Sequence, residues 1–233
     1  MSDLDFARIE ALTFDCYGTL IDWEAGILAG LRRVLAPHRV AVTDDGLLES
    51  YAAAEADLEA GPYQRYREVL GESLQRVARG HGVEATADEM DAFGGSVGNW
   101  PVFPDSAAAL GRLKARFRLG VITNCDDDLF ALSNRRLGVA FDWVVTAQQV
   151  GAYKPDPRNF EVALERLGLP RERVLHVAQS LFHDHVPAKT LGLATAWIDR
   201  RRGRPGFGAT PPAEATPDLV APDMATFVEL ALA

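Results

Sequence analysis

Cysteine is scarce in this sequence of 233 residues. Only Cys16 and Cys125 occur, and two cysteines cannot form a disulfide framework or a structural zinc site. We interpret both as small packing residues, because the spacing pairs neither of them with a histidine. The low cysteine content argues against a disulfide-stabilised secreted domain and favours a cytoplasmic protein.

Long apolar runs and an excess of positive charge are also absent. No apolar stretch is long enough to span a bilayer, and no signal peptide is visible. The 24 Lys and Arg residues against 33 Asp and Glu residues give a formal net charge of −9. An acidic surface repels polyanions, so we expect neither nucleic acid nor a membrane as a partner. A small anionic substrate remains possible, because it needs only a local positive pocket.

The composition is otherwise that of a globular chain, with 48% hydrophobic and 24% charged residues. This balance excludes intrinsic disorder, collagen-like repeats and a coiled-coil rod. The length suits one sizeable domain, or a core domain with a smaller insert.

Short apolar segments bounded by turn residues predict five buried strands, at 9–14, 118–123, 141–146, 174–178 and 193–198. Helical patterns lie between them. Asp105 is the expected N-cap of a helix over 106–117, and Asp156 followed by Pro157 marks the start of another. Alternating strands and helices predict an α/β fold, a Rossmann-like core of three layers with a parallel sheet.

Residues 23–100 have a different pattern. The segments 25–35, 44–59 and 63–81 have helical spacing, and no convincing strand occurs among them. We therefore predict an α-helical cap over 23–100, inserted after the first strand, and a catalytic core formed by 1–22 and 101–233. Such an insert lies at the carboxyl ends of the strands, where open α/β sheets bind ligands.

Asp15, at the carboxyl end of the first predicted strand, is the first candidate catalytic residue. Aspartate is depleted in strands and costly to bury unpaired, although a turn or capping role would also explain it. Three further clusters at strand ends favour chemistry: Thr123-Asn124, Lys154 before Pro-Asp-Pro, and a loop that ends at Asp184. A carboxylate can attack an electrophilic centre, and Lys154 would hold Asp15 ionised.

These four segments occur in the order of the four motifs of the haloacid dehalogenase superfamily, which the chain resembles from Asp15 to about Ile198. The resemblance implies that Asp15 is a covalent nucleophile and that Thr123 is the second-motif hydroxyl. It also implies that Lys154 is the third-motif lysine and that Asp184 belongs to the acidic fourth motif.

The residue two positions after Asp15 discriminates between reactions of this superfamily. Its phosphatases have an aspartate there as general acid, whereas this chain has Tyr17, which resembles the L-2-haloacid dehalogenase branch. A halide leaves without protonation, so that acid is dispensable. Gln179 stands where the phosphatases have a magnesium ligand, and Mg²⁺ prefers carboxylate oxygens. We therefore expect no metal and no other cofactor.

The resemblance thus implies a hydrolase acting on carbon–halide bonds. It would convert short 2-haloalkanoic acids, which are small anions, to 2-hydroxy acids through an aspartyl ester without a metal. The expected catalytic residues are Asp15, Thr123, Lys154 and Asp184. The expected substrate-binding residues are Tyr17, Thr19, Asn124, Gln179, Ser180 and His183. The resemblance also suggests a homodimer.

Several features depart from the dehalogenase pattern. Phe160 replaces an expected tyrosine, and the fourth-motif loop is one residue longer. The arginine that the dehalogenases supply from the cap has no certain match, and its candidates are Arg32, Arg65 and Arg67.

Some alternatives stay open. His183 and His185 either hydrogen-bond a halide or the hydrolytic water, or cap a surface helix. We expect the basic loop 200–204 to be solvated. The chain could instead be a Mg²⁺-dependent phosphatase of a small phosphomonoester, or a catalytically silent protein that retains the fold for binding.

Overall fold

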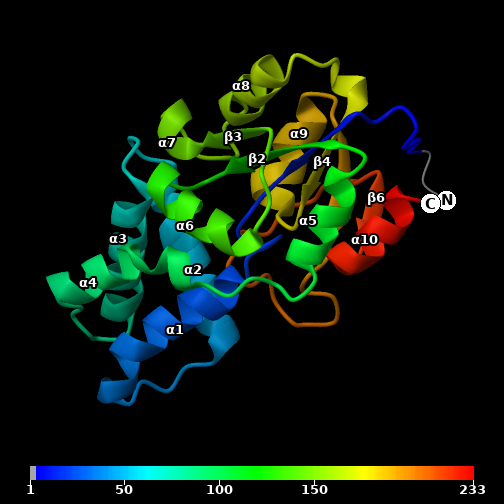
Figure 1. Cartoon of the computed structure of the whole chain (residues 1–233). Helices are drawn as coiled ribbons and strands as arrows, with labels where there is room; N and C mark the ends of the chain where they lie inside the picture. Colours follow the sequence, from blue (N-terminus) through cyan, green and yellow to red (C-terminus); the bar gives the residue numbers. More distant parts are fainter. Residues whose placement is uncertain (1–3) are drawn as a thin grey trace.

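A six-stranded parallel sheet forms the centre of the computed structural model, which describes residues 4–233 (Figure 1). The strands are β1 (Ala11–Phe14), β2 (Arg118–Thr123), β3 (Trp143–Thr146), β4 (Val174–Ala178), β5 (Ala194–Ile198) and β6 (Leu219–Ala221). Their order is β3-β2-β1-β4-β5-β6, and each neighbouring pair is parallel. The predicted α/β class is confirmed. Strand β6 was missed because it has three residues and one of them, Val220, is exposed.

Helices cover both faces of the sheet, which gives the predicted three layers. These helices are α5 (Ser106–Lys114), α6 (Asp127–Leu137), α7 (Ala147–Val150), α8 (Arg158–Leu167), α9 (Val186–Thr190) and α10 (Met224–Ala231). Successive strand residues point to opposite faces. Leu12 and Phe14 therefore share one hydrophobic cluster with α5, α6 and α10, whereas Ala11 belongs to a second cluster with α8 and α9. Within residues 4–233, no helix has the length and apolarity to cross a bilayer.

Four helices follow β1 before the chain reaches α5, and we refer to them as the cap helices. They are α1 (Trp23–Leu35), α2 (Asp44–Glu59), α3 (Tyr66–Gly80) and α4 (Ala87–Gly94). Figure 1 shows them grouped at one end of the molecule, beyond the carboxyl end of β1. Their buried side chains join the hydrophobic cluster that covers one face of the sheet. The assignment of residues 23–100 to a separate domain stays a prediction.

Helix α3 begins three residues later than predicted, because a core residue fixes its start. The buried carboxylate of Asp126 accepts the backbone N–H groups of Tyr66 and Arg67 at 3.1 and 3.2 Å. Asp126 follows β2 and immediately precedes α6. A carboxylate placed at free N–H groups stabilises a helix N-terminus, so this residue joins the cap helices to the core.

One capping prediction holds in part and another was wrong. Asp105 is the N-cap residue of α5 as predicted, but its side chain makes no capping hydrogen bond to that helix, which ends at Lys114 and not at residue 117. Its carboxylate accepts the Met224 N–H at the start of α10 and pairs with Arg200 at 2.9 Å. Pro157 is the N-cap of α8, not its first helical residue.

The prediction of a solvated basic loop was wrong for its first two arginines. Arg200 binds the Asp105 carboxylate, and Arg201 is only 9% exposed. The Arg201 guanidinium contacts Glu24 of α1 at 2.6 Å and Asp45 of α2 at 2.8 Å. These acids lie more than 150 residues away along the chain, so only the packing of the cap helices brings them to the loop.

Candidate active site

The motif residues meet at the carboxyl ends of the central strands. Asp15 follows β1, which lies between β2 and β4. Thr123 ends β2, Lys154 follows β3 and the short helix α7, and the loop after β4 leads to Asp184. Since parallel strands end at the same edge of a sheet, segments far apart in sequence converge there.

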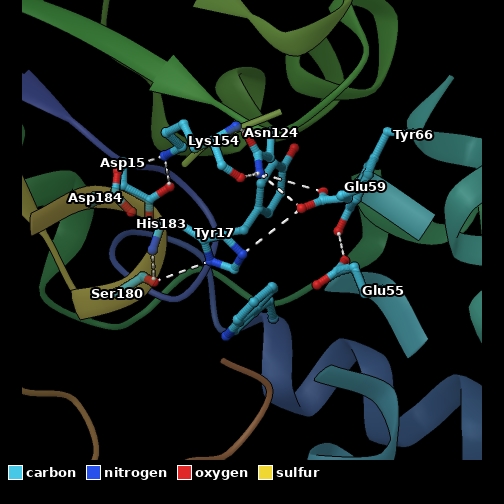
Figure 2. Close-up of a pocket in the computed structure, with 11 residues that line it drawn as sticks. Asp15, Tyr17, Glu55, Glu59, Tyr66, Asn124, Lys154, Ser180, His183 and Asp184 are labelled. Carbon is cyan, nitrogen blue, oxygen red and sulfur yellow. Dashed lines mark hydrogen bonds and ion pairs between the residues drawn. The ribbon is translucent and has the colours of Figure 1, made fainter. Parts of the chain in front are cut away.

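A buried lysine bridges two carboxylates at the centre of the site (Figure 2). The Nζ atom of Lys154 lies 2.9 Å from Oδ1 of Asp15 and 2.7 Å from Oδ1 of Asp184, and it donates a third hydrogen bond to the Ile122 carbonyl at 2.9 Å. All three side chains of this ion cluster are less than a tenth exposed. Burial alone would lower the pKa of Lys154, but the two carboxylates raise it above its ordinary value. The lysine therefore remains an ammonium.

The second oxygen of Asp15 is held by its own turn. The Thr19 hydroxyl donates to Oδ2 at 2.7 Å and accepts the backbone N–H of Gln179 at 2.8 Å. Gly18 adopts a φ of +93° in this turn, a conformation that glycine reaches without strain. Burial raises the pKa of Asp15, while Lys154 and Thr19 favour the carboxylate and limit the rise.

Asp184 is the more acidic of the two carboxyls. Its Oδ1 atom lies 2.9 Å from Nε2 of His176, whose Nδ1 atom lies 2.8 Å from the Thr13 hydroxyl. An ionised carboxylate only accepts, so His176 donates from Nε2 and accepts the Thr13 proton at Nδ1. Burial would raise the pKa of Asp184, but Lys154 and His176 outweigh it and hold this pKa below its ordinary value. The other oxygen, Oδ2, is buried and lacks a hydrogen-bond partner within residues 4–233.

A cavity of about 20 Å³ separates this ion cluster from the cap helices. That volume holds about one water molecule, so the cap helices lie closely over the site. The residues that line the cavity are Asp15, Tyr17, Trp23, Glu55, Glu59, Tyr66, Asn124, Lys154, Ser180, His183 and Asp184. Trp23, Glu55, Glu59 and Tyr66 come from the cap helices and were not predicted, since helical spacing alone does not show which face meets the core.

Two buried glutamates of α2 form the cap side of the cavity. The Glu55 carboxylate accepts hydrogen bonds from the hydroxyls of Tyr51 at 2.7 Å and Tyr66 at 3.0 Å. Burial raises the pKa of Glu55 to about 7, although these two hydrogen bonds oppose the rise. Glu59 lies one turn further on, with its Oε2 atom 3.2 Å from Nδ2 of Asn124. Burial and the neighbouring Glu55 raise the pKa of Glu59 well above its ordinary value.

None of the three candidate cap arginines lines this cavity. Arg32 pairs with Asp44 at 2.6 Å at the protein surface. Arg65 and Arg67 form ion pairs with carboxylates at the start of α6, those of Asp126 and Asp128. Among the described residues that line the cavity, the only cation is therefore Lys154.

The side chain of Tyr17 forms an aromatic wall of the cavity and carries no carboxyl group. The Tyr17 hydroxyl lies 3.0 Å from the Ser133 hydroxyl and accepts the Cys125 thiol at 3.4 Å. Burial raises its pKa well above the ordinary tyrosine value, so it stays neutral. Cys16 and Cys125 are both buried, in agreement with the packing role predicted for them.

Both histidines of the fourth motif are buried, so neither caps a surface helix. They lie in a π-helical turn, Leu181–His185, a conformation that is frequent at functional sites. Burial lowers the pKa of His183 to about 4, which leaves its ring neutral at physiological pH. His183 lines the cavity, whereas His185 Nε2 donates to the Ala178 carbonyl at 3.0 Å and has a structural role.

Three predicted site residues lie outside the cavity. Thr19 lies behind Asp15 and positions it. Thr123 is fully buried, and its hydroxyl has no hydrogen-bond partner in the part of the chain that the structure describes. Gln179 was expected to contact substrate, but its side-chain oxygen accepts the Thr210 hydroxyl at 3.5 Å, and its backbone N–H is bound to Thr19.

The donor set does not fit Mg²⁺. Asp15 and Asp184 both direct Oδ1 at the ammonium of Lys154, and the neutral side chain at position 179 points away from them. A hard dication needs several oxygen ligands, and the described residues contain no group of three or more His, Cys, Asp or Glu side chains arranged to hold a metal. The ammonium of Lys154 balances one of the two carboxylate charges.

A parallel α/β sheet with an aspartate after its first strand and a buried lysine beside it defines the class of this protein. The chain belongs to the haloacid dehalogenase-like hydrolases, whose family model matches residues 9–180. The resemblance noted in the sequence is thereby confirmed, including its L-2-haloacid dehalogenase branch.

Individual relatives include dehalogenases and a phosphatase of the same family. The (S)-2-haloacid dehalogenase H-109 of Pseudomonas putida is 26% identical over 217 residues, which cover 88% of this chain and 93% of that protein. The crystal structure of the L-2-haloacid dehalogenase PA0810 superposes with a TM-score of 0.76 at 28% identity, and covers 97% of this chain and 100% of that one. A phosphoserine phosphatase of Thermus thermophilus is 31% identical over 170 residues, 71% of this chain and 64% of that protein.

Proposed function

We propose that this hydrolase removes halide from short 2-haloalkanoic acids and releases 2-hydroxy acids, without a metal ion. The observation that carries the proposal is the Asp15–Lys154 pair beside a residue 17 that is a poor proton donor. Lys154 stabilises the ionised nucleophile, and burial raises the pKa of Tyr17 well above its ordinary value, which makes it a weak general acid for an alcohol leaving group. The names of the dehalogenase relatives support the same reaction.

In the first step, a carboxylate oxygen of Asp15 attacks the carbon that bears the halogen. A carbon–oxygen bond forms, the carbon–halogen bond breaks, and the halide leaves with the bonding electrons. The configuration at this carbon inverts, and the product is an ester of Asp15. Lys154 and Thr19 orient the attacking carboxylate, while Tyr17 forms the wall beside it.

In the second step, water attacks the carbonyl carbon of the Asp15 ester. Asp184 is suited to accept a proton from this water, because its Oδ2 atom is buried and unpaired while Oδ1 is held by Lys154 and His176. As the carbonyl–oxygen bond of the ester breaks, Asp184 returns the proton to the departing alkoxide, which leaves as the 2-hydroxy acid. The second proton of the water is released to solvent, and the Asp15 carboxylate is regenerated. The amide of Asn124 lies at the cavity wall, where its Nδ2 atom is bound to Glu59 and to the Lys154 carbonyl.

Halide release from chloroacetate and from L- and D-2-chloropropionate tests this proposal. We expect release that persists in EDTA and is abolished by Asp15→Asn, because an amide is a poor nucleophile. Full activity in this variant would refute the ester mechanism. A parallel assay with p-nitrophenyl phosphate and Mg²⁺ tests the phosphatase alternative, and phosphate release without halide release would overturn the dehalogenase proposal.

A further inference from the structure

The cap side of the cavity is acidic where an anionic substrate would need positive charge. Glu55 and Glu59 of α2 line the cavity opposite the ion cluster (Figure 2). Lys154 is the one cation of this lining, and its three hydrogen bonds go to Asp15, Asp184 and the Ile122 carbonyl. In the part of the chain that the structure describes, the cavity therefore offers no unpaired cation to a substrate carboxylate.

Glu59 also occupies the amide donor that a substrate carboxylate would use. Nδ2 of Asn124 lies 3.2 and 3.4 Å from the two carboxyl oxygens of Glu59 and 3.0 Å from the Lys154 carbonyl. The Asn124 side-chain oxygen accepts the Lys154 N–H at 2.7 Å, which fixes the orientation of the amide. A substrate carboxylate bound to Asn124 would contact Glu59, and two ionised carboxylates in contact repel each other.

An unpaired nitrogen points to the same place. His183 Nε2 is buried, lacks a hydrogen-bond partner within residues 4–233, and lies 3.8 Å from Oε2 of Glu59. The His183 side chain is 8% exposed, and its other nitrogen lies 3.1 Å from the Ser180 hydroxyl. A buried polar atom without a partner marks a position where a bound molecule can complete the hydrogen bonding.

We propose that Glu59 sets the charge specificity of this active site, an inference that rests on the dehalogenase function proposed above. Glu59 accommodates the carboxylate of a 2-haloalkanoate only when Glu59 is protonated. The neutral Glu59 side chain then donates a hydrogen bond to the substrate carboxylate. Anion binding is therefore coupled to protonation of Glu59. Ionised Glu59 excludes anions but admits an uncharged substrate such as a 2-haloalkanamide. The Glu59 carboxylate accepts hydrogen bonds from the amide N–H groups of that substrate.

Few of the charged and titratable groups around Glu59 change their charge near neutral pH. The surrounding groups are Tyr51, Glu55, Tyr63, Tyr66, Tyr153, Lys154, Asp156, Arg158 and His183, with Asp15 and Asp184 across the cavity. Burial raises the pKa values of the four tyrosines, and ion pairing keeps Lys154 and Arg158 charged and Asp156 ionised. His183 is neutral, with a pKa of about 4. Burial raises the pKa values of Asp15, Glu55 and Glu59, so these groups account for the pH dependence. Ionisation of Asp15 increases activity as the pH rises, whereas ionisation of Glu59 decreases anion binding.

The test compares a charged and an uncharged substrate of the same shape. We expect kcat/KM for halide release from L-2-chloropropionate to fall about tenfold per pH unit above the pKa of Glu59, whereas kcat/KM for L-2-chloropropionamide stays level there. Glu59→Gln keeps a neutral donor at the same position, so it should abolish the alkaline decline for the carboxylate. Glu49→Gln removes a charge from an exposed position of α2 and should keep the wild-type profile.

Several results would overturn the proposal: an equal decline for both substrates, no turnover of the amide, or a decline that survives in Glu59→Gln. A binding measurement gives a result that does not depend on turnover. Calorimetric titration of wild-type protein with L-lactate, in buffers of different ionisation enthalpy, should show uptake of about one proton per bound anion above the pKa of Glu59. Lactate binding without proton uptake would refute the role of Glu59, whereas failure of all haloacids to release halide would refute the proposed function instead.

Discussion

Replacing Lys154 with methionine isolates the contribution of the ammonium group to this site. Methionine keeps the length of the apolar chain but removes the positive charge and its three hydrogen bonds. Asp15 and Asp184 would then be two buried carboxylates without a cation. Removing one partner of a buried ion pair typically costs about 3–5 kcal/mol of folding free energy. For a chain of this length, we expect the melting temperature to fall by roughly 6–20 °C.

The pH dependence of that loss follows from the two carboxyls. Without Lys154, the pKa of Asp15 and that of Asp184 in the folded state rise above their unfolded values. A carboxyl with a raised folded pKa opposes folding when it is ionised, so the penalty is full above the folded pKa and fades as the pH falls through it. Wild-type protein also loses the stabilisation from the lowered pKa of Asp184 in acid. The stability difference should thus be widest at neutral pH and narrow toward about pH 4.

Urea denaturation at several pH values measures this difference, with Lys114→Met as a matched control. Lys114 pairs with Asp142 at 2.5 Å, but both side chains are about a third exposed, so its loss should cost no more than about 1 kcal/mol. The double variant Lys154→Met with Asp184→Asn removes one charge of each sign and should recover part of the stability. A Lys154→Met protein as stable as wild type at neutral pH, or a difference that does not change with pH, would refute the reasoning.

Two further substitutions probe the nucleophile and the wall beside it. Thr19→Val removes the hydrogen bond to Oδ2 of Asp15, so the pKa of Asp15 should rise and the acid limb of the activity profile should move to higher pH; an unmoved limb would contradict this role. Tyr17→Phe removes only the hydroxyl contacts with Ser133 and Cys125, so kcat should stay within about tenfold of wild type. A loss of a thousandfold would show that Tyr17 does transfer a proton.

Local patterns were sufficient to predict most of the core. Strands β2 and β4 have the predicted bounds, as has helix α2, because continuous apolar runs and helical periodicity reflect burial directly. Errors occurred where a distant residue determined the local structure. Helix α3 starts at Tyr66, where the Asp126 carboxylate accepts its backbone N–H. The Asp105 carboxylate accepts a backbone N–H at the start of α10, and not one of α5, the helix that follows it.

The sequence by itself determined the reactive half of the site. Asp15, Lys154 and Asp184 each follow a buried strand, and parallel strands end at one edge of a sheet, so their meeting followed from the order of the segments. Only the tertiary structure decided what faces them. Glu59 belongs to a helix whose periodicity shows that one side is buried, but not against which partner. The docking of α2 over the sheet edge places this carboxyl 3.2 Å from Asn124, and burial in that contact gives Glu59 its raised pKa.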